Sequence, residues 1–185
     1  DTIGRSGSAG AGGRPVAWTG TEVLLEGADY GTVTLSALDI DTGTQRPVPP
    51  PPAAEADLTG RPVGGTTFIP MDQGRVAAVS TYQSTEPVLS ISNADLSSWV
   101  EVPLADVTGT LDWTMVWSGH ELVTLRPGGA AYSPDTDTWR QLAPYPPGTE
   151  PTGPWQSGPA IAAGRYLVGP EGIYDLEADQ WTHTD

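Results

Sequence analysis

The sequence predicts an all-β fold made of short strands joined by many turns. Its 185 residues include 23 Gly and 19 Pro, which are spread along a chain that also carries repeated runs of aliphatic residues. No stretch places apolar residues at the i, i+3, i+4 and i+7 spacing of an amphipathic helix over three turns. Short apolar runs separated by Gly and Pro are typical of all-β architectures.

Two sequence marks recur in phase and divide the chain into four repeats. The first mark is a Gly that precedes an apolar run; its four copies are Gly20, Gly74, Gly119 and Gly164. The first two copies are 54 residues apart, and the following intervals are 45 residues each. The second mark is an acidic residue four positions before a Trp, or before Gln45 in the first repeat; the acids are Asp41, Asp95, Asp135 and Glu177. A period near 45 residues with about four short strands per unit is that of a β-propeller blade.

We therefore expect a β-propeller of four blades in a single domain spanning residues 1–185. The blades are expected at about 12–49, 66–104, 111–144 and 155–185, with an insertion at 49–65 that begins with the Pro49–Pro52 run. Inner strands are predicted near Val23–Leu25, Val76–Val79, Leu122–Leu125 and Tyr166–Val168. Outer strands are predicted to open at Gln45, Trp99, Trp139 and Trp181.

Each mark has a physical reason. The repeated Gly suits a tight hairpin that requires a positive φ. An acid such as Asp135 can accept hydrogen bonds from backbone N–H groups two residues further on and so fix the turn before the outer strand. The large face of the following Trp can pack against the neighbouring blade, so Trp99, Trp139 and Trp181 are expected to be mostly buried.

The stretch Tyr132–Trp139, with the double glycine Gly128–Gly129 before it, resembles the kelch repeat, whose element reads Tyr-Asp-Pro-x-Thr-x-Thr-Trp. Residues 18–25 and 117–123 resemble the inner-strand segment of bacterial kelch-like proteins, a group whose propellers are similar to the central domain of galactose oxidase. The resemblance covers nearly the whole chain and is strongest in the third and fourth repeats; the first two depart from it at Leu38, Ser92 and Gln45. It implies a kelch-like propeller but no particular activity, because similar propellers are interaction platforms, sugar-processing enzymes and oxidase scaffolds.

The charge of the chain excludes one class of partner. The formal net charge is −15, and all eight basic residues are Arg. A surface this acidic repels nucleic-acid phosphates and anionic lipid headgroups, and it favours solubility. Neither nucleic-acid binding nor membrane insertion is expected, since no apolar run reaches the length of a membrane span.

The residues that would hold a metal or cofactor are scarce. The chain has no Cys, which excludes disulfides, thiol chemistry and the Cys–Tyr link of a kelch-type copper oxidase. The two histidines are His183 near the end and His120, which falls in a predicted hairpin turn. The acidic turns Asp39–Gly43 and Asp135–Asp137 offer oxygen ligands for Ca²⁺, but neither supplies a twelve-residue loop ending in Glu, and both are interpreted as turn caps. We expect no metal and no cofactor.

No catalytic residue can be nominated either. Ser133–Trp139 resembles the sialidase box Ser-x-Asp-x-Gly-x-Thr-Trp, but Asp137 replaces the glycine, the box is one residue short, and no trio of arginines accompanies it. No nucleophile elbow, Walker loop or dinucleotide fingerprint occurs. Trp155, in the Pro- and Gly-rich loop 146–159, is the one candidate for ligand binding; the alternative is that it covers a blade edge.

The sequence therefore favours a non-catalytic binding or scaffolding module that recognises a protein or a glycan. The alternative is part of a sugar-active kelch-type propeller enzyme, of the epimerase or lyase class, with catalytic groups partly outside this chain. The first residue is Asp rather than Met, so the chain is interpreted as an excerpt or a processed product, and a cleaved export signal would place it outside the cell or on its surface.

Four blades are few for a closed ring, because kelch propellers generally close with six or seven. An open arc would expose apolar faces on its two end blades. We expect such an arc to need the remaining blades of a longer chain, another subunit or a second copy of itself; a compact four-blade ring is the alternative.

Overall fold

The computed structural model describes residues 13–29, 32–52, 65–80, 87–104, 115–124, 129–144, 161–169 and 172–182. Within these ranges the chain forms four antiparallel sheets of four strands each. A single 3-10 turn, η2 (Asp72–Gly74), lies between β5 and β6. Each sheet uses four strands that follow one another in the chain, so each is an up-and-down meander. We call these sheets blades 1 to 4.

The strand bounds are as follows. Blade 1 contains β1 (Arg14–Trp18), β2 (Glu22–Asp29), β3 (Thr32–Asp39) and β4 (Gln45–Val48). Blade 2 contains β5 (Thr66–Pro70), β6 (Val76–Ser80), β7 (Val88–Ser92) and β8 (Trp99–Val102). Blade 3 contains β9 (Met115–Trp117), β10 (Leu122–Thr124), β11 (Ala130–Ser133) and β12 (Thr138–Gln141). Blade 4 contains β13 (Ile161–Ala163), β14 (Tyr166–Gly169), β15 (Gly172–Asp175) and β16 (Gln180–Thr182).

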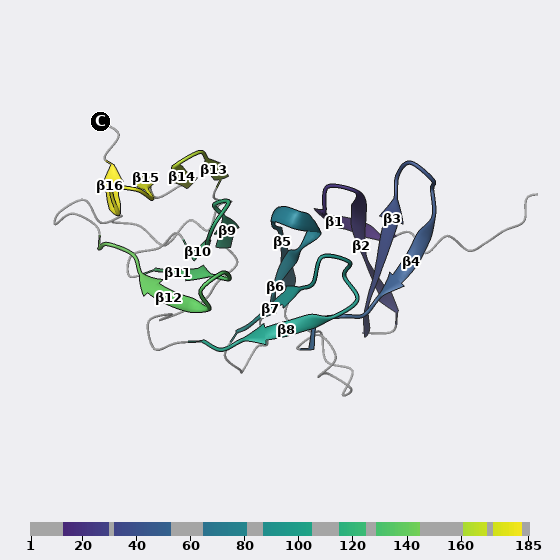
Figure 1. The fold of residues 1–185 in the computed structure, drawn as a ribbon. Coiled ribbons are helices and arrows are strands. Elements are labelled where there is room, and N and C mark those ends of the chain that lie inside the picture. Colours follow the sequence, from purple (N-terminus) through teal and green to yellow (C-terminus); the bar gives the residue numbers. More distant parts are fainter. Residues whose placement is uncertain are drawn as a thin grey trace, which may run out of the picture.

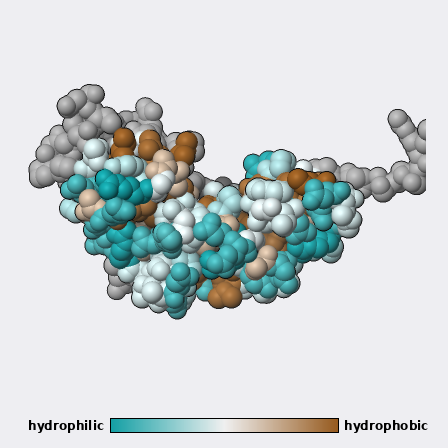
Figure 2. Space-filling model, turned by 45° about the horizontal axis from the view of Figure 1, so that its top comes forward, coloured by the Kyte–Doolittle hydropathy of each residue, from teal (hydrophilic) through white to brown (hydrophobic). Residues whose placement is uncertain are grey.

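The blades stand side by side in an arc, with blade 1 and blade 4 at its two ends (Figure 1). The first strands of the blades lie toward the inside of the arc, and they contact one another in the order β1, β5, β9, β13. Figure 2, in which the top of the arc is turned forward, shows hydrophobic surface at both ends of the arc. The all-β, propeller-like arrangement predicted from the sequence is confirmed.

The prediction of the inner strands was wrong by one strand. The segments expected there, which begin at Val23, Val76, Leu122 and Tyr166, belong to the second strands β2, β6, β10 and β14. A further strand precedes the repeated Gly in every blade, so the chain enters each blade at the inside of the arc. The outer strands begin within one residue of the predicted positions.

The repeated glycines make the hairpins between the first and second strands. Their φ angles are 100° at Gly20, 78° at Gly74, 99° at Gly119 and 62° at Gly164, a region that L side chains rarely adopt. At Gly74 a Cβ atom would also lie 2.9 Å from the Ala94 carbonyl oxygen. The positive φ predicted for these positions is confirmed.

In blades 1, 2 and 4 an acid caps the turn before the outer strand, but it is not always the predicted acid. In blade 1 the Asp39 carboxylate accepts hydrogen bonds from the backbone N–H groups of Asp41 and Thr42, at 2.9 and 3.0 Å. Asp175 accepts the equivalent bonds in blade 4. In blades 1 and 4 the capping acid therefore lies two residues before the acid predicted for that blade. In blade 2 the predicted acid, Asp95, accepts a hydrogen bond from the Ser97 N–H group, as expected.

Three hydrophobic cores hold the arc together, and each lies between two adjacent blades. The core between blades 1 and 2 includes Leu24, Leu35, Phe68 and Ala78. The core between blades 2 and 3 includes Ile69, Leu89, Leu122 and Tyr132. The core between blades 3 and 4 includes Val123, Ala131, Leu167 and Tyr174. Because side chains alternate along a strand, every inner blade presents one apolar row to each neighbour.

The outer-strand tryptophans fasten each blade to the preceding one. The indole N–H of Trp99 donates to the Pro49 carbonyl at 2.8 Å, and that of Trp139 donates to the Pro103 carbonyl at 2.9 Å. Trp181 donates in the same way to Ala143 at 3.0 Å. Each acceptor lies just beyond the last strand of the preceding blade.

The predicted burial of these tryptophans is correct for one of the three. Trp181 is 8% exposed, but Trp99 and Trp139 are only half-buried. Gln45 takes the position in blade 1, and its amide donates to Ser36 of the same blade.

Replacing Trp139 tests this fastening. Trp139→Ala should lower the free energy of unfolding by about 3 kcal/mol, near the lower limit for a large aromatic because the ring is half-buried. Trp139→Phe keeps most of the contact with Tyr132, whose ring centroid lies 5.1 Å away, and should cost about 1 kcal/mol for the lost hydrogen bond. Urea unfolding measures both values, and equal losses in the two variants would contradict a separate contribution of the N–H group.

Candidate functional site

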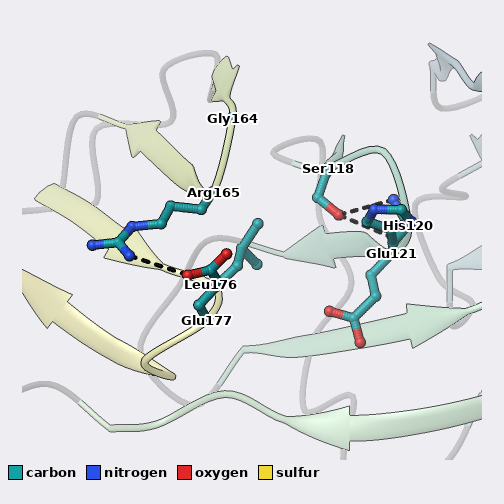
Figure 3. Close-up of a pocket in the computed structure, with 7 residues that line it drawn as sticks. All are labelled: Ser118, His120, Glu121, Gly164, Arg165, Leu176 and Glu177. Atoms are coloured by element: carbon teal, nitrogen blue, oxygen red, sulfur yellow. Dashed lines mark hydrogen bonds and ion pairs between the residues drawn. The ribbon is translucent and has the colours of Figure 1, made fainter.

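A cleft of about 480 Å³ opens between blades 3 and 4. It lies at the edge of the arc that carries the Gly hairpins and the acidic turns, because its walls come from the β9–β10 hairpin, the β13–β14 hairpin and the β15–β16 turn. Figure 3 shows the β9–β10 hairpin on one side and the blade 4 residues on the other. The lining residues are Ser118, His120, Glu121, Gly164, Arg165, Leu176 and Glu177.

The wall from blade 3 is a hairpin closed by a hydroxyl group. Ser118 Oγ accepts hydrogen bonds from the backbone N–H groups of His120 and Glu121, at 3.3 and 2.9 Å. Thr19 closes the hairpin of blade 1 in the same way, with a 3.0 Å bond from the Glu22 N–H group. The Ser118 hydroxyl thus has a structural task, and it holds the exposed His120 at the tip of the hairpin.

Glu121 begins a chain of charged contacts that crosses to blade 4. Its two carboxylate oxygens accept bonds from Arg140 Nε and Nη2, at 2.9 and 2.8 Å. Arg140 Nη1 also donates to Asp179 Oδ1 at 2.7 Å, and the Tyr174 hydroxyl donates to the same Asp179 oxygen. Tyr174 in turn accepts a bond from the backbone N–H of Ala143.

This chain shifts the pKa of three of its members. The bond to Glu121 raises the pKa of Arg140, and the bonds from Tyr174 and Arg140 lower the pKa of Asp179. Burial, followed by the bond to Asp179, raises the pKa of Tyr174 to about 12. Arg140 and Asp179 therefore stay charged and Tyr174 stays protonated over the whole neutral range.

The opposite wall is organised by Arg165. Its guanidinium donates to the Tyr166 hydroxyl at 2.7 Å and pairs with Glu177 at 3.1 Å and with Asp175 at 3.2 Å. It also lies over the Tyr166 ring, 4.9 Å from the centroid. The bond to Tyr166 and then the bond to Glu177 raise the pKa of Arg165. Glu177 remains 70% exposed, so its carboxylate is open to a ligand.

The cleft combines an apolar residue with charged groups from both walls. Leu176 lies between the two walls, and the carboxylates of Glu121 and Glu177 come from opposite sides of it (Figure 3). Because Arg140 binds both oxygens of Glu121, the exposed carboxylate of Glu177 is the one that a cationic or hydroxyl-rich group could contact, with Leu176 as its apolar neighbour. Among the described residues, no three His, Cys, Asp or Glu side chains gather closely enough to hold a metal ion.

The sequence did not identify this cleft. Trp155, the one predicted ligand contact, lies outside the described residues, and so does His183. His120 was expected to be an exposed turn residue, and it is exposed on a hairpin that also lines the cleft. The sequence does carry one signal of this wall. In blades 1 and 3 a Glu lies two residues after the hairpin Gly, and an Arg follows the position at which the outer-strand Trp is expected. In blade 1 these residues, Glu22 and Arg46, form the same bidentate ion pair as those of blade 3.

Comparison with known proteins extends the description of the fold. No family model and no curated protein matches the chain. Among solved structures, the chain is similar to TolB from Acinetobacter baumannii, with a TM-score of 0.51 and 14% sequence identity. The match covers 92% of this chain and 42% of the TolB chain, so this chain spans less than half of that length. What the two share is a propeller-like fold. In the part of the chain that the structure describes, no helix has the length and apolar character needed to cross a membrane.

The two tyrosine–aspartate pairs predict a loss of stability in alkali. Burial and then the bond to Asp137 raise the pKa of Tyr132 to about 12, as burial does for Tyr174. Below the ordinary tyrosine pKa of 10 both folded and unfolded states keep these protons, so the contribution of the two tyrosines to stability is constant. Between pH 10 and 12 the unfolded chain releases them first, and the free energy of unfolding should fall.

Urea midpoints measured at pH 8, 10 and 11 check this expectation. The double variant Tyr132→Phe, Tyr174→Phe should be less stable at pH 8 and should lose part of the decline between pH 10 and 11. A decline of the same size in the double variant would show that other groups cause it.

Proposed function

We propose that the chain is a non-catalytic binding module of a kelch-type propeller, and that its cleft between blades 3 and 4 recognises a protein partner. The observation that supports this proposal is the pairing of the charged groups in the cleft. Glu121 is bound on both oxygens by Arg140, and Arg165 is bound by two carboxylates and a phenol. The propeller-like fold places such a cleft on a rigid frame.

Catalysis would require a different arrangement. A general acid or base needs a titratable group that faces the substrate and is not already neutralised by a fixed partner. Glu121 has such a fixed partner, and the Ser118 hydroxyl is occupied by two backbone N–H groups of its own hairpin. These groups hold the shape of the walls, which favours recognition over a sugar-active enzyme.

The charge of the cleft and of the whole chain favours a basic partner. The net charge of −15 attracts a positively charged surface over long range and raises the rate of encounter. A Lys or Arg side chain could then lie on Leu176 and pair with Glu177. A glycan held through its hydroxyl groups by the same carboxylates is the other ligand class, and the test below includes it.

The proposal also includes the kelch type of the propeller and the cellular localisation of the protein. Tyr132–Trp139 supports the kelch type, because the Tyr132 and Trp139 rings of this element are in contact across β11 and β12.

We place the protein on the cell surface or outside the cell. Antibody labelling of a tagged chain on intact and on permeabilised cells of its source would test this; a signal that requires permeabilisation with release of cytoplasmic markers would contradict it.

A charge reversal in the cleft tests the function. Arrays of basic, neutral and acidic peptides, and an array of glycans, are probed with the wild-type chain and with Glu177→Lys. The wild type should retain basic peptides, and Glu177→Lys should weaken this retention by about tenfold, the effect of losing one exposed attraction and adding a repulsion of similar size. Glu101→Lys is the matched control, because it makes the same charge change at an exposed site on β8 outside the cleft.

The control separates local recognition from general attraction. Equal losses in Glu177→Lys and Glu101→Lys would mean that net charge alone drives binding and that the cleft is not the site. Retention of glycans alone would reassign the ligand class, and chemical conversion of any arrayed glycan would overturn the non-catalytic proposal.

A further inference from the structure

The end faces of the arc follow the same pattern as the three interfaces inside it. We call the face that a blade turns toward the next blade its front face, and the opposite face its back face. The front rows, read from the inside of the arc outward, are Ala17, Leu24, Ala37 and Arg46 in blade 1 and Val116, Val123, Ala131 and Arg140 in blade 3. In blades 2 and 4 they are Ile69, Ala77, Ile91 and Val100, and Ile161, Val168, Ile173 and Thr182.

These rows alternate between two kinds. The rows of blades 1 and 3 end in an Arg that reaches the next blade, since Arg46 donates to the Asp95 carbonyl and Arg140 to Asp179. The rows of blades 2 and 4 have Ile at the first and third positions and no Arg. Blade 4 therefore presents the kind of front face that blade 2 presents to blade 3.

The front face of blade 4 is uncovered. In blade 2 the corresponding isoleucines, Ile69 and Ile91, are 6% and 8% exposed because blade 3 packs on them. In blade 4, Ile161 is 63% exposed and Val168 is 40% exposed. Leu167 and Tyr174, on the opposite face of the same strands, are fully buried against blade 3. The front face of blade 4 is thus an apolar surface of the kind that forms a blade–blade interface, but no blade packs on it.

The back face of blade 1 supplies the matching half. Blade 3 meets the Ile row of blade 2 with a back row that begins Trp117, Leu122, Tyr132. The back row of blade 1 has the same register and begins Trp18, Val23, Leu38. Trp18 is 44% exposed, whereas Trp117, in the same position of blade 3, is packed into the core between blades 2 and 3.

We propose that the front face of blade 4 binds the back face of blade 1 of a second copy of this chain, and that two such contacts close an eight-bladed ring. The two faces lie at opposite ends of one arc and cannot meet within it (Figure 1). A second copy provides both complementary faces at once. The two contacts are related by a twofold axis, which makes the assembly closed, and eight blades lie within the range of about four to eight known for propellers.

Light scattering coupled to size exclusion tests the ring on the 185-residue chain. The wild type should have twice the 19.3 kDa chain mass at about 50 µM protein. Ile161→Asp should weaken this association by about 100-fold or more, because it places a carboxylate in an apolar contact. Ile40→Asp is the matched control: Ile40 is 57% exposed on the β3–β4 turn, outside both faces, and its variant should remain dimeric.

A second variant establishes which faces meet. Trp18→Asp should also yield monomers, and mixing it with Ile161→Asp should restore part of the dimer, since one wild-type contact remains in the mixed ring. Circular dichroism must show that both variants keep the β spectrum of the wild type. A dimer that Trp18→Asp leaves intact would overturn the head-to-tail contact.

Three further outcomes would overturn the ring. A monomeric wild type is expected if further blades of a longer polypeptide cover the two faces instead. Masses that grow without limit with concentration would mean that the contact forms but does not close. Equal association of Ile161→Asp and Ile40→Asp would place the contact elsewhere.

Discussion

The whole arc depends on the packing of one blade's aliphatic front row against the aromatic back row of the next. A sheet of three- to eight-residue strands is a single layer and must bury its apolar face against another layer. The three cores accordingly lie between blades, and none lies within a blade. The stability of each sheet is therefore shared with its neighbours, as in other repeat proteins, and the tryptophan hydrogen bonds fix how far one blade is rotated against the next.

The candidate site is a product of one of these interfaces. Glu121 and Arg140 come from blade 3, Asp179 and Tyr174 come from blade 4, and the contacts among them cross the boundary. The same network positions one wall of the cleft and closes the outer edge of the core beneath it. A ligand that moved the two walls apart would have to break Arg140 from Asp179, so the width of the cleft is coupled to the packing of the blades.

The sequence predicted those parts of the structure that depend on local chemistry. A glycine at positive φ and a large aromatic at the start of an outer strand can be recognised without a partner, and both were placed correctly. Two of the innermost strands, Met115–Trp117 and Ile161–Ala163, could not be found in this way, because they are three residues long and carry no measurable alternation. The capping acids were misplaced for a similar reason: Asp39 and Asp41 have the same side chain, and only the backbone path of the turn decides which one accepts the N–H bonds. The cleft was missed because Glu121 and Arg165 are far apart in sequence and come to line one cleft only when two blades have packed.

The reach of the tryptophan bonds sets an order of events during synthesis. Each indole closes a contact with a carbonyl that lies 36 to 50 residues earlier in the chain. On a ribosome that adds about 5–20 residues per second, the acceptor carbonyl at the end of a finished blade therefore remains without its tryptophan donor for roughly 2–10 s. During this interval the newest blade carries an apolar front row with nothing against it. A nascent chain of this protein thus has two open sheet faces at every stage of its growth, the back face of blade 1 and the front face of the newest blade, and a chaperone would have to shield both.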